Sequence, residues 1–216
     1  MTARARPVVL AAEFFARPAE EVARRLLGSV IVSEVHGQRT SGRIVETEAY
    51  VGESDLACHA RSGRTARNAV MYGPAGRAYV YFTYGNHWML NVVTERAGFP
   101  AAVLIRAIQP LQGGRIISTR RNGRDTFGPG KLTHALGISR GENNMDLANP
   151  RSRLRIERGI EVPTSMVTEG PRVGLSTVPE PWKSKPWRFL VKGWRLGSGD
   201  QGSEVPGHRK DSRRKH

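Results

Sequence analysis

The sequence predicts one mixed α/β (α+β) domain over residues 1–196, followed by a flexible basic tail over residues 197–216. Three observations support this fold class. Short segments with strand alternation are separated by turns that contain Gly and Pro, a few segments have helical character, and neither an internal repeat nor a linker divides the chain. The length of 216 residues also suits a single domain of generous size.

The N-terminal part is expected to hold one short helix and two strands. Residues 18–27, PAEEVARRLL, suit a helix because Pro is favoured at the first helical position and Gly28 at the C-terminal stop. Acidic residues near its start and basic residues near its end match the helix dipole. Residues 29–35 and 39–50 follow as two strands joined across residues 36–38.

The middle of the chain is predicted as a polar loop followed by a β-hairpin. Residues 52–68 are polar and contain Gly, which is typical of a loop with at most one helical turn. Residues 78–83 and 87–94 alternate as strands, with residues 84–86 as the turn. Residues 101–108 form a further apolar strand.

The last part is predicted to hold two helices and a strand. Pro110 opens a helix over residues 111–121, and residues 128–138, GPGKLTHALGI, form a tight turn into a second helix. Residues 188–194 have strand character. The tail over residues 197–216 is rich in Gly, Ser, Arg and Lys and is expected to be mobile.

The charge balance points to a polyanionic partner. The chain has 34 Lys and Arg against 19 Asp and Glu, a net charge of +15, and the tail contributes only a small part of it. Nucleic acid is the default partner for such a protein, and a basic proteome background that aids solubility is the alternative. No apolar run of about 18 residues occurs, so we expect no membrane partner. The N-terminus lacks a clean leader pattern, so we expect a cytoplasmic protein, associated with the nucleoid if it is bacterial.

Cysteine and histidine usage argues against a metal centre. Cys58 is the only cysteine, which excludes intramolecular disulfides and Cys-rich zinc sites. A nucleophilic Cys58 beside His59 is one interpretation, and a small, partly buried thiol is the favoured one. The six histidines lack HxxxH or HxH spacing, so we expect no metal and no cofactor. The GSGDQG match to a dinucleotide motif lies in the polar tail with no helix after it.

The strand RIVETEAY offers two carboxylates on one face. Glu46, Glu48 and Tyr50 share one parity along the strand and therefore point the same way. A carboxylate in a partly dry pocket can activate water as a general base, and it can stabilise an oxocarbenium-like state at a sugar. An ion pair with the basic surface is the ordinary alternative. Spacing alone does not choose between Glu46 and Glu48.

The Tyr-rich hairpin suggests contact with nucleobases. Tyr79 and Tyr81 lie on one face, and Tyr84 lies in the turn, where an exposed ring can wedge into a base stack from the minor groove. A Tyr84 ring folded back on its own hairpin is the alternative. His59 lies in an Arg-rich loop as a pocket donor or stacking ring. GPGK places Lys131 at a helix start suited to one phosphate, with an ordinary surface lysine as the alternative.

Taken in order, these motifs resemble the alkyladenine (3-methyladenine) DNA glycosylase family of the mammalian type. RIVETEAY, the AxHxR element, YVYFTYG, VLIRAIQPL, GPGKL and KPWRF recur in sequence over residues 28–193. The resemblance implies a curved, mainly antiparallel sheet flanked by helices, with a protruding β-hairpin. It also implies a monomeric, monofunctional DNA repair N-glycosylase that needs no cofactor. Such an enzyme flips alkylated or deaminated purines out of double-stranded DNA and hydrolyses the N-glycosidic bond, leaving an abasic site.

The resemblance further implies individual roles. The residues concerned are Glu48 as the water-activating base and Arg106 beside it; Tyr50, His59, Tyr81 and Asn91 as the base pocket; Tyr84 as the intercalating residue; and Lys131 and Arg64 as backbone contacts. Glu46 has no role that can be carried over.

Two departures from the family pattern bear on substrate range. The loop after His59 is one residue shorter than in mammalian relatives, and Asn86 replaces an apolar residue beside the wedge. The alternative function is a non-catalytic nucleic-acid-binding protein that uses the same basic face and Tyr hairpin.

Overall fold

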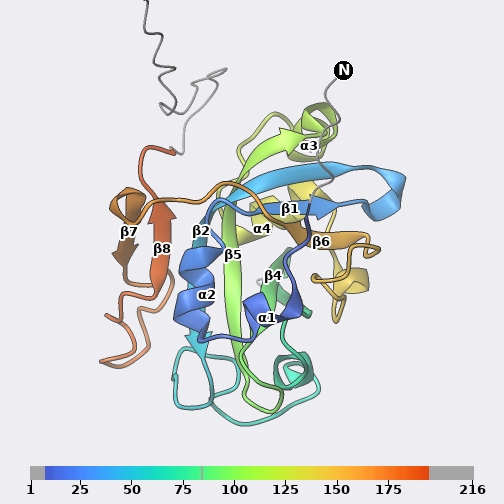
Figure 1. The fold of residues 1–216 in the computed structure, drawn as a ribbon. Coiled ribbons are helices and arrows are strands. Elements are labelled where there is room, and N and C mark those ends of the chain that lie inside the picture. Colours follow the sequence, from blue (N-terminus) through green and yellow to red (C-terminus); the bar gives the residue numbers. More distant parts are fainter. Residues whose placement is uncertain (1–7, 84, 195–216) are drawn as a thin grey trace, which may run out of the picture.

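The computed structural model describes residues 8–83 and 85–194 (Figure 1). Its strands are β1 Val30–Ser33, β2 Thr40–Val51, β3 Ala78–Thr83, β4 His87–Thr94, β5 Ala101–Gln112, β6 Leu154–Glu157, β7 Val167–Gly170 and β8 Arg188–Val191. Its α-helices are α1 Ala12–Phe15, α2 Ala19–Arg25, α3 Gly114–Arg121 and α4 Pro129–Leu136. Single 3₁₀ turns cover Val35–Gly37, Ala69–Tyr72, Arg140–Glu142 and Thr164–Met166.

The described strands form one curled antiparallel sheet. Its order is β3-β4-β5-β2-β1-β6, while β8 pairs with β2 and β7 pairs with β8. Strand β2 is the central element, because β5 runs along one of its edges while β1 and then β8 occupy the other. Figure 1 shows the long β2 and β5 crossing the molecule, with β7 and β8 set to one side. The predicted α+β class with a curved antiparallel sheet is confirmed.

The helices cover the sheet and bury the core. Helix α2 packs on β2 and β5, and α4 packs on β4 and β5. The predicted helix over residues 18–27 is confirmed in its place, with Pro18 as its N-cap, and Gly28 adopts a left-handed φ of 88°. Side chains such as Val22, Ile44 and Ile105 are fully buried between these layers. Both predicted strands of the hairpin, residues 78–83 and 87–94, are present, and the helix predicted within residues 128–138 covers Pro129–Leu136.

The predicted helix over residues 111–121 is wrong at its start. Strand β5 continues through Pro110 to Gln112, and α3 begins only at Gly114. Pro110 lies opposite Gly42, where the β2–β5 register shifts, and such an irregularity tolerates a residue without an amide donor. The proline therefore belongs to the end of a strand.

Other differences concern short elements. The last predicted strand, over residues 188–194, ends at Val191. Helix α1 and strands β6 and β7 have four residues each and were not predicted. Such elements are too short to show a period, and β6 is formed by pairing with β1, which is distant in sequence. The predicted tail over residues 197–216 lies outside the described residues.

Candidate active site

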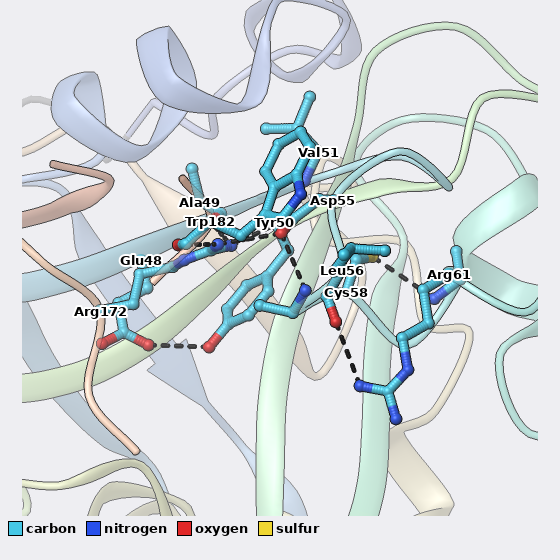
Figure 2. A network of polar contacts seen from close by, with 12 residues as sticks. Glu48, Ala49, Tyr50, Val51, Asp55, Leu56, Cys58, Arg61, Arg172 and Trp182 are labelled. Carbon is cyan, nitrogen blue, oxygen red and sulfur yellow. Dashed lines mark hydrogen bonds and ion pairs between the residues drawn. The ribbon is translucent and has the colours of Figure 1, made fainter. Parts of the chain in front are cut away.

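Both carboxylates of RIVETEAY are buried, but they differ in their partners. Glu46 is 5 % exposed and Glu48 is 0 % exposed. Glu48 Oε1 accepts a hydrogen bond from the Val173 backbone N–H at 2.7 Å. Its Oε2 accepts from the Tyr50 hydroxyl at 3.0 Å and from Arg106 Nη1 at 3.2 Å, and Figure 2 shows the contact with Tyr50. Both carboxylate oxygens are therefore held in place.

A β-bulge brings Arg106 to these carboxylates. In the β2–β5 pair, Glu46 lies opposite Ala107 and the next residue, Thr47, opposite Ile105, so Arg106 is the extra residue on β5. Bulges re-aim side chains in this way. Arg106 donates from Nε to Glu46 Oε1 at 2.9 Å and from Nη1 to Glu48, so one guanidinium bridges both carboxylates.

The two carboxylates are unequally neutralised. Glu46 Oε1 accepts a hydrogen bond from a second arginine, Arg188 Nε, at 2.6 Å, whereas within residues 8–83 and 85–194 Glu48 pairs with Arg106 alone. Burial raises the pKa of Glu48 above its ordinary value, although Arg106, the Val173 N–H and the Tyr50 hydroxyl act in the opposite direction. Glu48 is therefore better suited than Glu46 to exchange a proton, which spacing alone did not decide.

One register row across the sheet aligns the site. Tyr79 on β3 lies opposite Asn91 on β4, Asn91 opposite Leu104 on β5, and Leu104 opposite Glu48 on β2. Cross-strand neighbours point to the same face of a sheet. Asn91 is buried and donates from Nδ2 to the Tyr79 carbonyl at 3.2 Å, which fixes its amide.

An open cavity lies over this row. It is lined by Tyr50, Ala57, Cys58, His59, Met71, Tyr79, Tyr81, Asn91, Ala102, Val173, Gly174 and Leu175. All four predicted pocket residues are among them. Glu48 lies behind this wall and reaches the cavity through Tyr50 and Val173, which bind its two oxygens.

The aromatic wall is held by edge contacts. The His59 and Tyr81 rings meet edge-on with centroids 4.5 Å apart, and His59 Nδ1 lies 3.0 Å from the Tyr79 hydroxyl. Burial of ring atoms, with the nearby charges of Arg67 and Arg61, lowers the pKa of His59 to about 4. His59 is therefore neutral near pH 7 and does not repel a cationic ligand.

A buried ion pair that sequence analysis missed braces this wall. Arg172 and Asp55 are both fully buried, and the guanidinium binds the carboxylate at two points (Figure 2). Arg172 also lies over the rings of Tyr50 and Trp187, with its Cζ 4.7 Å and 5.0 Å from their centroids. Asp55 accepts from the backbone N–H of Ala57, a turn pattern that its position in a polar loop could have indicated. Nothing local in the sequence marks Arg172.

Arg67 is a second residue that was missed. It donates from Nη2 to the Phe82 carbonyl at 3.1 Å and lies over the Tyr81 ring, with its Cζ 5.3 Å from the centroid. The loop that carries His59 is thereby attached to the hairpin. The Arg-rich composition of this loop was the sequence signal that could have indicated Arg67.

Comparison with known proteins gives the family. The family model for methylpurine-DNA glycosylase (MPG) matches residues 13–195, most of the chain. A protein of Myxococcus xanthus is 50 % identical over 179 residues, covering 83 % of this chain and 88 % of its own. Proteins of Methanocella arvoryzae and Chlorobaculum tepidum are 46 % and 40 % identical over 85 % and 93 % of this chain, and 92 % and 96 % of their own. All three are provisionally named 3-methyladenine DNA glycosylases.

The chain belongs to the methylpurine-DNA glycosylase family. It is therefore a DNA glycosylase, a hydrolase that acts on N-glycosyl bonds, and DNA is its substrate. The non-catalytic alternative is set aside.

Two of the predicted DNA contacts of this glycosylase, Lys131 and Arg64, lie outside the pocket. Lys131 is exposed and binds both oxygens of Asp125 at 3.1 Å. Arg64 is exposed, with its Cζ 5.7 Å from the Tyr72 ring centroid. Tyr84 lies outside the described residues. The structure thus leaves these three roles as predictions.

One chemistry considered from the sequence, a nucleophilic Cys58, finds no support in the structure. Cys58 is 1 % exposed, and burial raises the pKa of its thiol to about 12, so it stays a neutral packing group rather than a nucleophile. Within residues 8–83 and 85–194, no group of three or more His, Cys, Asp and Glu side chains is placed to hold a metal. Over the same residues, each helix is too short or too polar to span a bilayer.

Proposed function

We propose that this glycosylase flips alkylated or deaminated purines out of duplex DNA into the aromatic cavity. It then hydrolyses the N-glycosidic bond with a water activated by Glu48. The observation that carries this proposal is a fully buried carboxylate, bound by Arg106 and Tyr50, directly behind the wall of an aromatic pocket.

The pocket suits an electron-poor base. The rings of Tyr50, Tyr81 and neutral His59 line the cavity. A purine alkylated at N3 or N7 is cationic, and each good ring face favours such a cation by roughly 0.5–2 kcal/mol. No cationic side chain lines the cavity among the described residues.

Asn91 is the candidate for base discrimination. Its Nδ2 is committed to the Tyr79 carbonyl, so its position at the pocket floor is fixed. A fixed side chain at this place disfavours a base with an extra exocyclic amine, such as guanine. Selectivity of this kind rests on a clash or an unpaired polar group rather than on added attraction.

Hydrolysis needs little beyond a positioned water. Ionised Glu48 takes a proton from the water as its oxygen attacks the sugar C1′, and the C1′–N bond breaks with its electron pair moving to the base. The leaving base is neutral when the lesion was cationic. Arg106 favours the ionised form of Glu48, and the carboxylate also stabilises the oxocarbenium-like state.

The enzyme acts as a monomer on double-stranded DNA that contains damaged purines. The basic surface binds backbone phosphates without selecting a sequence, and Tyr84 fills the gap left by the flipped base. Filling that gap offsets part of the unstacking cost, which is a few kcal/mol.

The test compares Glu48→Gln with Glu161→Gln, an exposed glutamate. Release of free base from methylated DNA, and abasic product from duplexes with one hypoxanthine or 1,N6-ethenoadenine, are measured in single turnover. Glu48→Gln should bind lesion DNA as the wild type does and lose base release by at least a hundredfold. Glu161→Gln should match the wild type. Normal turnover by Glu48→Gln would refute the assignment.

A further inference from the structure

A second cavity lies outside the candidate active site, at the start of β4. It is lined by Asn86, His87, Trp88, Arg121, Gly130, Thr133, His134, Gly137, Ile138 and Ser139. These residues come from the hairpin, the end of α3, and α4 with the turn that follows it. The cavity volume is about 360 Å³, which admits a phosphate group with its waters.

The cavity lies beside the part of β4 that is not paired with β5. The two strands pair only over residues 91–94 and 101–104, so the first residues of β4 have no β5 neighbour. Helix α4 takes that place, and Thr133 Oγ1 donates to the Trp88 carbonyl at 2.8 Å. Gly130 makes room for the His87 ring, since a Cβ there would lie 2.8 Å from it. The helix and the hairpin are therefore in direct contact.

Among the described residues, the lining is basic and has no acidic member. It includes His87, His134 and Arg121, and Arg121 Nη1 lies 3.3 Å from His134 Nδ1. An arginine has donors only, so Nδ1 accepts and the proton of the neutral ring lies on Nε2. The nearby Asp125 carboxylate is bound to Lys131. Three donor groups thus meet in a cavity whose described lining contains no carboxylate.

We propose that this cavity is a phosphate subsite, in which His87, Arg121 and His134 bind one backbone phosphate of the DNA beside the flipped nucleotide. The proposal rests on the proposed function, because the cavity is adjacent to the hairpin turn that we expect to enter the DNA. A phosphate in the cavity would hold the hairpin and α4 together.

The same helix connects to the catalytic side. The backbone N–H of Gly128, the residue before α4, donates to the carbonyl of Arg106 at 2.9 Å. The Arg106 side chain in turn binds Glu48. Occupation of the subsite therefore fixes the hairpin relative to the strand that carries Arg106.

Protonation provides a distinct signature. Burial lowers the pKa of His134, and the charges facing it, Arg121 and Arg120 from α3 and His87 from β4, act in the same direction. A backbone phosphodiester, which carries one negative charge, would offset these charges and raise the pKa of His134. Binding should then take up a proton and weaken as pH rises.

The experiment replaces single phosphates by neutral methylphosphonates in a duplex with a tetrahydrofuran abasic-site analogue. In wild-type protein, one replacement near the analogue should weaken binding by about tenfold through this subsite. In the His134→Gln/Arg121→Gln variant, the same replacement should cost less than about twofold, because the contact is already lost. Arg151→Gln removes an exposed charge before β6, at the opposite edge of the sheet, and should behave as the wild type does.

Two further measurements separate the outcomes. Single-turnover base release at saturating protein tests the proposed function, so absence of release by the wild type would be a failure of that function and not of the subsite. An unchanged methylphosphonate profile in a variant that melts at the wild-type temperature would overturn the subsite. NMR titration of His134 with inorganic phosphate completes the test. Tight binding of free phosphate together with a flat methylphosphonate profile would also overturn the assignment to DNA.

Discussion

Arg172 and Asp55 form a buried, two-point ion pair that joins two chain segments lining the aromatic cavity. Arg172 Nη1 lies 2.5 Å from Asp55 Oδ2, and Nη2 lies 2.9 Å from Oδ1. Asp55 belongs to the loop that carries His59, and Arg172 immediately precedes Val173, whose N–H binds Glu48. The pair therefore sets the separation between the aromatic wall and the segment above the carboxylate.

Asp55→Asn should destabilise the fold strongly. The substitution leaves the Arg172 guanidinium buried without its counter-ion, which costs about 3–5 kcal/mol of unfolding free energy. Urea unfolding at pH 7 measures the loss. Asp146→Asn is the matched control, because Asp146 also accepts a turn N–H and pairs with an arginine, Arg77, but at the surface. A loss below 1 kcal/mol for Asp55→Asn would show that the pair does not brace the pocket.

The rate of base release should rise with pH through the raised pKa of Glu48. The carboxylate acts only when ionised, so below that pKa the rate should increase about tenfold per pH unit and then level off. The contribution of Glu48 to folding stability changes with pH in the opposite direction. A raised pKa means that the native state holds this proton more tightly than the unfolded state, so ionisation of Glu48 costs stability as pH rises. Single-turnover rates of base release from methylated DNA, measured across pH, test this increase. A flat profile below neutrality would contradict the role of Glu48.

Glu46→Gln should move the rising part of the pH–rate profile to lower pH. Glu46 raises the pKa of Glu48 through like-charge repulsion and shares Arg106 with it, so a neutral side chain removes both effects. The plateau rate should also fall by about tenfold to a hundredfold, since Arg106 loses an anchor.

The matched control for Glu46→Gln is Glu34→Gln, since Glu34 also accepts from two arginines, Arg39 and Arg155, away from the pocket. It should leave the pH profile unchanged. If Glu46→Gln lowers the plateau rate but leaves the rising part of the pH–rate profile at the same pH, Glu46 has a structural role only.

Asn91→Ser should relax discrimination against guanine-type bases. The shorter side chain leaves the pocket floor open where a purine carries its exocyclic amine, and a change of this size is worth about 1–3 kcal/mol. The readout is the ratio of guanine-type to adenine-type bases released from methylated DNA. Asn143→Ser is the control, because Asn143 also binds the backbone of β3, at Val80, but does not line the cavity. An unchanged ratio would remove Asn91 from the selection of bases.

The sequence by itself determined the hairpin strands, the helix that begins within GPGK and the shared face of Glu46 and Glu48. These features follow from local periodicity and turn chemistry, which act over a few neighbouring residues. The order of the motifs likewise identified the family, which the matched model and relatives confirm. Pro110 marks the limit of this local information, because a proline that suits a helix start also suits the irregular end of β5.

Only the tertiary structure decided which carboxylate is poised to exchange a proton. The difference between Glu46 and Glu48 comes from Arg188, Arg106 and Val173, which lie far away along the chain and meet β2 through strand pairing and a bulge. Burial then gives these contacts their effect, because a charge removed from water depends on the few groups that touch it. Local patterns indicate which way a side chain points, but they carry no information about which distant residues contact it.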